Sequence, residues 1–115
     1  MLSFKHRNSI IKLKFEDALD IYLDNHFDFI YVDGYAHTGE EGGKTFFQWW
    51  NKLKIGGIFS GDDYDKDKWK LVYDNVNKFC YEKETTLHVI QNDVKNRTNT
   101  TCMDLSPSWY TFKHK

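Results

Sequence analysis

The sequence predicts a single α/β domain with a mostly parallel sheet, flanking helices and an antiparallel edge. Short apolar runs typical of strands alternate with segments of helical period, and this alternation favours parallel pairing through right-handed crossovers. The last two predicted strands have no helix between them, so they can pair antiparallel at one edge. The 115 residues, of which 40% are hydrophobic, allow one domain over residues 1–115.

The first half of the chain predicts two strands around one helix. Residues 9–14 have the alternating, β-branched character of a short strand, and residues 16–25 carry apolar side chains at helical spacing. Residues 27–32 form a nearly continuous apolar run. Such a run favours a strand that is covered on both faces of its sheet.

A second helix is predicted to begin at a capping box formed by Thr38 and Glu41 and to end near residue 53. Gly42 and Gly43 fall in its first turn and cost about 1 kcal/mol each relative to alanine, so we expect a mobile or late start. The remaining elements are a strand over residues 58–61, a helix over 67–81, and strands over 85–91 and 109–113 around a polar loop.

Composition argues against several classes of partner. With 16 basic and 17 acidic residues the net charge is −1, which gives no electrostatic reason to expect nucleic-acid binding. Charges interrupt every apolar run near the N-terminus, so we expect neither a signal peptide nor a membrane span. Cys80 and Cys102 do not make a disulfide framework, which favours a reducing compartment. We therefore expect a cytoplasmic protein without membrane contacts.

Acidic residues follow two of the predicted strands. Asp33 comes directly after the strand over residues 27–32, and Asp62 and Asp63 follow the strand over residues 58–61. In an open α/β sheet, ligands bind in the crevice at the carboxyl ends of the strands. Three carboxylates brought together there repel one another unless a cation or protons intervene. The alternative is that these residues only end strands and cap turns.

Three short motifs of the sequence resemble those of a known protein family. Residues 28–34 (DFIYVDG), residues 53–58 (LKIGGI) and residues 107–110 (PSWY) resemble the fourth strand, the turn into the fifth strand and the last strand of class I S-adenosylmethionine-dependent methyltransferases. The match covers roughly residues 10 to 113. It implies a partial Rossmann-like methyltransferase domain. The family's glycine-rich cofactor loop and the acidic residue that holds the ribose are absent.

The resemblance also implies what the sheet lacks. The first two strands of the methyltransferase fold, which lie between the third and the fourth, have no counterpart in this chain. Their absence leaves a gap with open strand edges, and an open edge is a template for pairing with another chain. We therefore expect a homo-oligomer formed through the open sheet edge. The alternatives are that the first predicted strand moves next to the fourth, or that the chain belongs to a longer parent.

Site residues follow from the same resemblance, in particular to the metal-assisted small-molecule O-methyltransferases. Asp33, Asp62 and Asp63 match the positions that bind Mg²⁺ or another divalent cation. His37 matches a loop histidine that serves as general base beside Asp33, and its alternative is an exposed loop histidine. The residues expected to contact the cofactor are Glu16, Asp17, Asp33 and Gly34.

These observations predict methyl transfer from S-adenosylmethionine to the hydroxyl of a small-molecule acceptor, by an enzyme or a fragment of one. The missing glycine-rich loop favours an alternative for the isolated chain, a non-catalytic Rossmann-like half-domain that acts in assembly or interaction. A third hypothesis, an unrelated nucleotide-binding half-domain, is weaker because the sequence has no G-x-G-x-x-G motif.

Overall fold

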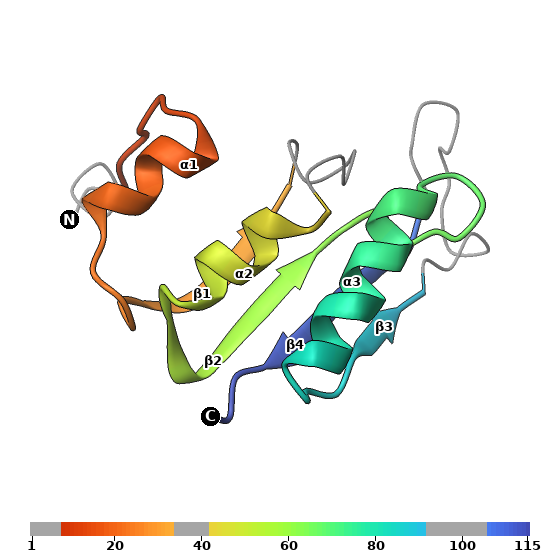
Figure 1. Ribbon diagram of the computed structural model, residues 1–115. Helices are drawn as coiled ribbons and strands as arrows, with labels where there is room; N and C mark the ends of the chain where they lie inside the picture. The colour runs from red at the N-terminus through yellow and green to blue at the C-terminus, as the bar shows by residue number, and fades with distance from the viewer. Residues whose placement is uncertain (1–7, 34–41, 92–105) are drawn as a thin grey trace, which may run out of the picture.

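A four-stranded mixed sheet forms the centre of the protein in the computed structural model, which describes residues 8–33, 42–91 and 106–115. The strand order is β1-β2-β4-β3, so β1 and β3 form the two edges (Figure 1). The strands are β1 (Phe27–Val32), β2 (Leu53–Gly61), β3 (His88–Ile90) and β4 (Ser108–Phe112).

The two longer helices lie on the same face of this sheet (Figure 1). They are α2 (Lys44–Trp50), which connects β1 to β2, and α3 (Lys70–Glu82), which follows β2. A short helix α1 (Phe15–Ala18) and the 3₁₀ turn η2 (Leu19–Ile21) lie to the side, beyond the β1 edge. The predicted helix over residues 16–25 is therefore shorter, and a 3₁₀ turn completes it.

The pairing of β1 with β2 is parallel, as the sequence predicts. Ile30 lies beside Phe59, and Val32 lies beside Gly61. β4 is antiparallel to both of its neighbours, β2 and β3. The expectation of a mostly parallel sheet is wrong, because only one pair of strands is parallel. The last strand lies inside the sheet, where its side chain Trp109 is 1% exposed and packs under the helices.

The strand predicted over residues 9–14 is not present. This segment has no regular structure, and Ile10 is 93% exposed. A strand needs the hydrogen-bonding groups of a neighbour to satisfy its own backbone. The segment lies beyond β1 without pairing to it, so its β-branched composition alone does not produce a strand.

The late helix start is confirmed. Gly42 and Gly43 adopt left-handed conformations with φ of 70° and 84°, and α2 begins directly after them at Lys44. Only glycine adopts this region without strain. The proposed capping box at Thr38 and Glu41 lies outside the described residues.

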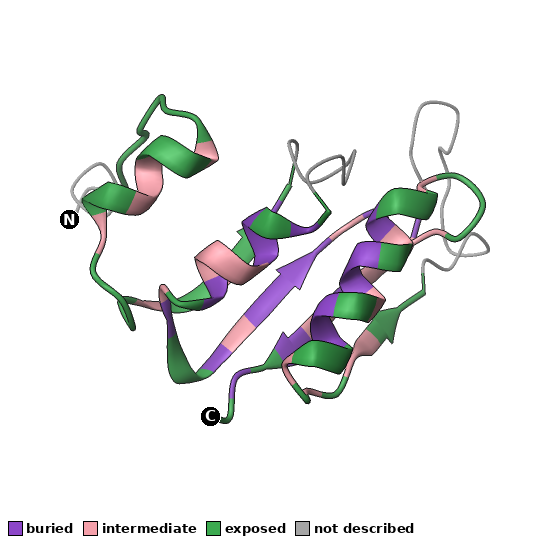
Figure 2. Cartoon of the chain, viewed as in Figure 1, coloured by how far each residue is buried: buried purple, intermediate pink, exposed green. Residues whose placement is uncertain are grey.

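The core lies between the helices and the sheet (Figure 2). Phe59 and Phe79 are fully buried, and their rings contact Phe46 and Trp50 mostly edge to face. Such aromatic pairs add about 0.5–1.5 kcal/mol beyond the area that they bury. Cys80 is also buried in this core, as expected for a structural thiol.

No described helix covers the other face of the sheet, which corrects the expectation for residues 27–32. Phe29 is 57% exposed and Tyr31 is 47% exposed, whereas Val32 on the helix side is buried. Right-handed crossovers that proceed in one direction along a sheet place their helices on one face. Because α2 and α3 both follow this direction, the apolar run is covered on one face only.

Candidate functional site

The carboxyl ends of β1 and β2 bring together the acidic residues that the sequence singles out. Asp33 follows β1, while Asp62 and Asp63 follow β2, and the parallel pairing places these ends at the same edge. All three carboxylates act electrostatically on the hydroxyl of Tyr31. Asp33, Asp62 and Asp63 therefore all lie near Tyr31 at one end of the sheet, and their grouping around a single ion stays a prediction.

Tyr31 lies close enough to these acids for all three to act on its hydroxyl. Burial raises the pKa of its phenol to about 12, with further contributions from Asp62, Asp33 and Asp63. Asp62 also accepts a hydrogen bond from the Tyr31 hydroxyl. A phenol with this pKa stays protonated at neutral pH, so Tyr31 acts there as a hydrogen-bond donor and not as a base.

The sequence analysis did not identify Tyr31 as a site residue, although a signal was available. In a strand, residues two apart point to the same face. Tyr31 precedes Asp33 by two positions, so its side chain lies on the same side of β1. Ser108 was also missed. It begins β4, and its Oγ donates a hydrogen bond of 3.2 Å to Asp62 Oδ1.

Asp62 and Asp63 lie in different environments despite being adjacent. Asp62 is partly exposed, whereas Asp63 is 2% exposed and adopts a left-handed conformation with φ of 60°. Aspartate tolerates this conformation better than most residues, at a cost in strain. The Oδ2 atom of Asp63 is enclosed and accepts no hydrogen bond from the described residues, while the side chain as a whole does interact with its surroundings.

The described residues do not form a preorganised binding site for the predicted cation. Across residues 8–33, 42–91 and 106–115, no group of three or more His, Cys, Asp or Glu side chains is arranged to hold a metal ion. The inward position of Asp63 separates it from the exposed Asp33, although both lie near Tyr31. The divalent cation remains a prediction from the resemblance.

The predicted cofactor contacts are divided between described and undescribed residues. Glu16 and Asp17 lie in the first turn of α1, and both are exposed. Their neighbours Phe15 and Ala18 line a cavity of about 320 Å³ between the N-terminal segment and β1. Gly34 and the proposed base His37 lie outside the described residues.

This cavity adjoins the open edge of β1. Its lining is largely apolar and includes Leu13 and Tyr22 from the N-terminal segment, Ile30 and Val32 from β1, and Trp49 from α2. It lies between residues 9–22 and the sheet, and the gap that the resemblance implies stays a prediction.

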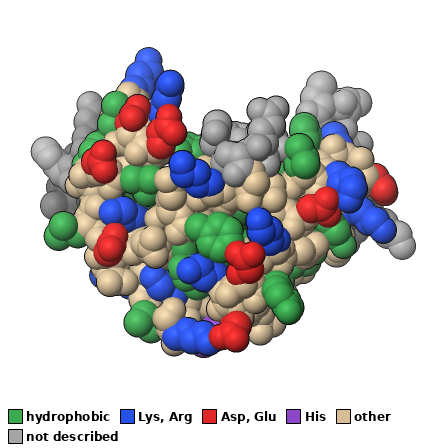
Figure 3. Space-filling model, viewed as in Figure 1, with side chains coloured by type: hydrophobic (Ala, Val, Ile, Leu, Met, Phe, Trp, Pro, Cys, Tyr) green, Lys and Arg blue, Asp and Glu red, His purple; other side chains and the backbone are tan. Residues whose placement is uncertain are grey.

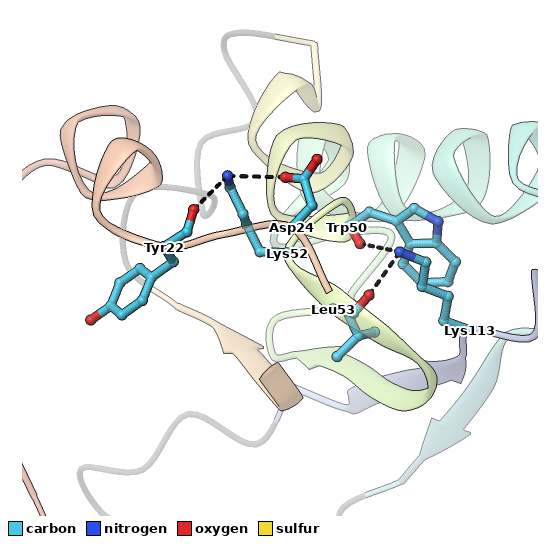
Figure 4. A network of polar contacts seen from close by, with 6 residues as sticks. All are labelled: Tyr22, Asp24, Trp50, Lys52, Leu53 and Lys113. Atoms are coloured by element: carbon cyan, nitrogen blue, oxygen red, sulfur yellow. Dashed lines mark hydrogen bonds and ion pairs between the residues drawn. The ribbon is translucent and has the colours of Figure 1, made fainter. Parts of the chain in front are cut away.

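The opposite end of the sheet carries lysines with structural roles (Figure 4). Lys113 Nζ donates hydrogen bonds of 2.8 Å to the carbonyl oxygens of Trp50 and Leu53, which closes the end of α2. Burial lowers the pKa of Lys113, and the nearby charge of Lys83 lowers it further. Lys52 binds the Tyr22 carbonyl at 2.8 Å and the Asp24 carboxylate at 3.0 Å, which ties the N-terminal segment to β2.

Comparison with known proteins does not assign a family. No family model matches the chain, and a search of curated proteins gives no significant match. Within the described part of the chain, no helix combines the length and the apolar character that crossing a membrane requires. The geometry of the site therefore carries the functional argument.

Proposed function

We propose that this chain provides part of the site of an S-adenosylmethionine-dependent methyltransferase that acts on the hydroxyl group of a small molecule. One observation supports the proposal most strongly: Asp33, Asp62 and Asp63 converge on Tyr31 at the carboxyl ends of a parallel strand pair. This is the position at which open, Rossmann-like α/β sheets bind their ligands. The acidic cluster also suits a substrate with positive charge, such as a sulfonium.

The chemistry would be an in-line displacement at the sulfonium methyl group. The acceptor oxygen forms a bond to the methyl carbon, the carbon–sulfur bond breaks, and the acceptor proton passes to a base. His37 is the predicted base. Positioning of the two reactants supplies most of the rate enhancement in such a reaction. Tyr31 and Asp62 would orient the acceptor through hydrogen bonds, and no step requires the predicted cation.

The isolated chain should bind the cofactor weakly or not at all in the micromolar range. The glycine-rich loop that would hold the methionine end is absent, and each lost hydrogen bond costs about 1 kcal/mol. The remaining contacts would come from Asp33 and from the N-terminal segment around Glu16 and Asp17. These 115 residues would therefore supply only part of the cofactor site.

A second candidate function is supported by a different observation. Among the described residues, β1 is an edge strand, and Phe29 and Tyr31 on one face of the sheet are exposed. These features suit a half-domain that acts in assembly without catalysis. The two functions differ in whether the carboxyl ends of β1 and β2 recognise the cofactor.

Heteronuclear NMR of the labelled chain with millimolar S-adenosylhomocysteine tests the methyltransferase proposal. We expect shift changes confined to Tyr31, Asp33 and Asp62, and we expect Asp33→Asn to abolish them. The matched control is Asp67→Asn, because Asp67 is exposed and lies beyond the cluster. Equal shifts with ATP would favour a general nucleotide site. The absence of any shift at these residues would leave the assembly function.

A further inference from the structure

A second cavity lies at the end of the sheet opposite Asp33, Asp62 and Asp63. Its volume is about 340 Å³, which is in the range of about 300–1,000 Å³ typical of small-molecule sites. Its walls come from the segment before β1, the end of α2, the start of β2, and the residues that follow α3 and β4. Among the described residues, three lysines and one acid line it, and these are Lys83, Lys113, Lys115 and Asp24. The cavity therefore gathers basic side chains from parts of the chain that are far apart in sequence.

Lys113 is the most buried of the three lysines. It is 7% exposed, and its Nζ donates hydrogen bonds of 2.8 Å to the carbonyl oxygens of Trp50 and Leu53 (Figure 4). An ammonium carries three N–H groups, so these two bonds leave one donor over. The Trp50 ring, whose centroid lies 5.6 Å from Nζ, is a weak partner in comparison with a charged oxygen. Lys113 can therefore donate one further hydrogen bond to a ligand in the cavity.

The charges around Lys113 do not cancel. Burial lowers the pKa of its ammonium most strongly, the charge of Lys83 lowers it further, and the carboxylate of Asp24 raises it by less. Asp24 is itself bound by Lys52 Nζ at 3.0 Å. Ammonium groups that repel one another are stabilised by an anion placed between them. The cavity therefore offers a net positive environment that an anion would neutralise.

The ends of the helices explain only part of this basic cluster. Lysines often lie at the C-terminal end of a helix, where they bind its last carbonyl groups. This accounts for Lys113 at the end of α2. It does not account for Lys83, because the carbonyl oxygens of Phe79 and Cys80 at the end of α3 already accept hydrogen bonds of 2.9 and 3.0 Å from backbone N–H groups. The Lys83 Nζ lies 5.6 Å from the centroid of the Phe47 ring, so its charge is available to a ligand.

We propose that this cavity binds a small organic molecule with a phosphate group, and that Lys83, Lys113 and Lys115 donate hydrogen bonds to the phosphate oxygens. A phosphate monoester carries about 1.5 to 2 negative charges near pH 7 and three acceptor oxygens, so it can meet ammonium groups from several sides. Lys115 pairs with Glu84 at the surface in the free protein. Exposed ion pairs of this kind contribute little free energy, so Lys115 can exchange its carboxylate partner for the phosphate.

The rest of the cavity suits the organic part of the ligand. Trp50 and Ile55 supply apolar surface, and the side-chain amides of Asn25 and Asn51 can donate or accept hydrogen bonds. A phosphate group alone leaves this surface uncovered, which favours a phosphate monoester over inorganic phosphate. The site lies at the opposite end of the sheet from Asp62, so it does not rest on the proposed methyl transfer.

Heteronuclear NMR of the isotope-labelled full chain, titrated with phenyl phosphate at constant ionic strength, tests the site. We expect bound phenyl phosphate to raise the pKa of Lys113, because the anion stabilises its charged form. Lys83→Met should weaken binding about tenfold, since it removes a charge-assisted hydrogen bond. The matched control is Lys78→Met, because Lys78 is exposed on α3 and does not line the cavity. If Lys83→Met does not fold, Lys115→Met replaces it.

Two results would overturn the proposal outright. They are a pKa of Lys113 that phenyl phosphate leaves unchanged, and an equal loss of binding in Lys83→Met and Lys78→Met. Equal binding of benzoate, which has the same ring but a single charge, would show that the phosphate is not recognised. Inorganic phosphate should bind more weakly than phenyl phosphate, because it does not contact Trp50 or Ile55. Equal affinity for the two phosphates would contradict the assignment of these residues to the organic part.

Discussion

Phe59 and Phe29 lie on neighbouring strands of one parallel pair, yet their environments are opposite. Phe59 is fully buried, and its ring lies 5.4 to 6.2 Å from the rings of Phe46, Trp50, Phe79 and Trp109. Phe29, one row away and on the other face, is 57% exposed. The strands alone do not make a core. An amphipathic helix laid across the strands does, and the described part of the chain places its two longer helices on one face.

The two sides of the sheet also differ in the side chains at their surfaces. On the helix side, charged groups of both signs are scattered between smaller apolar areas (Figure 3). The opposite face of the sheet, the open face, instead carries the exposed Phe29 and Phe112 on either side of Ile58, with Tyr31 next to the acidic residues at one end.

The largest expected difference in unfolding free energy is between Phe59→Ala and Phe29→Ala. Truncation of a buried phenylalanine removes transfer energy and leaves a cavity, at a cost of about 3–5 kcal/mol. Truncation of Phe29 in the dilute monomer should cost less than about 1 kcal/mol. Urea unfolding at low protein concentration measures both. Similar losses for the two variants would mean that the open face is covered within the monomer.

Lys113→Met tests a polar group on the covered face. The substitution leaves the carbonyl oxygens of Trp50 and Leu53 without their buried donor, which should cost about 1–3 kcal/mol of unfolding free energy. Lys115→Met is the control, because Lys115 is exposed and its ion pair with Glu84 lies at the surface. If the two variants lose equal free energy of unfolding, the buried ammonium of Lys113 has no specific structural role.

The pH dependence of the same variant gives a second measurement. The folded pKa of Lys113 lies below the ordinary value of 10.5, so the unfolded chain binds this proton more readily. Stability contributed by this group therefore rises as the pH increases from the folded pKa to 10.5. Unfolding free energies measured across this range should rise for the wild type relative to Lys113→Met. A difference that falls with pH would contradict the lowered pKa.

The predicted cation should have a modest effect, because its ligands are not arranged in advance. If Mg²⁺ binds at Asp33, Asp62 and Asp63, it should stabilise the folded state by at most about 1 kcal/mol. This corresponds to a shift of a few degrees in the melting temperature. Asp62→Asn should remove the shift, and Asp67→Asn should retain it. A shift that survives in Asp62→Asn would place the cation elsewhere.

The smallest expected effect concerns the pKa of the Tyr31 phenol. With the folded pKa near 12 against 10.0 in the unfolded chain, stability falls as the pH rises through this window, and Tyr31→Phe should remove that loss. NMR of the labelled tyrosine ring should show that Asp62→Asn lowers the pKa. Asp67→Asn should leave it unchanged. If Asp62→Asn leaves the pKa of Tyr31 unchanged, the Asp62 carboxylate does not act on this phenol.

Part of the candidate site follows directly from strand periodicity. Asp33, Asp62 and Asp63 end two apolar strands, and parallel pairing then brings them together. Tyr31 could have been found in the same way, because alternation places it on the side of Asp33. Ser108 could not, because its position beside Asp62 depends on β4 entering the sheet next to β2.

The sequence by itself determined the local elements and the place of the acids. Apolar runs and helical periods specify β1 and α3 nearly where they lie, because these signals are local. The same signals give only the second half of β2 and a longer α2 than the structure has. Only the tertiary structure decided that residues 9–14 form no strand, that β4 lies inside the sheet, and that one face is open. Those outcomes depend on which partner each strand and each apolar face finds. The pattern within a single segment does not contain that information.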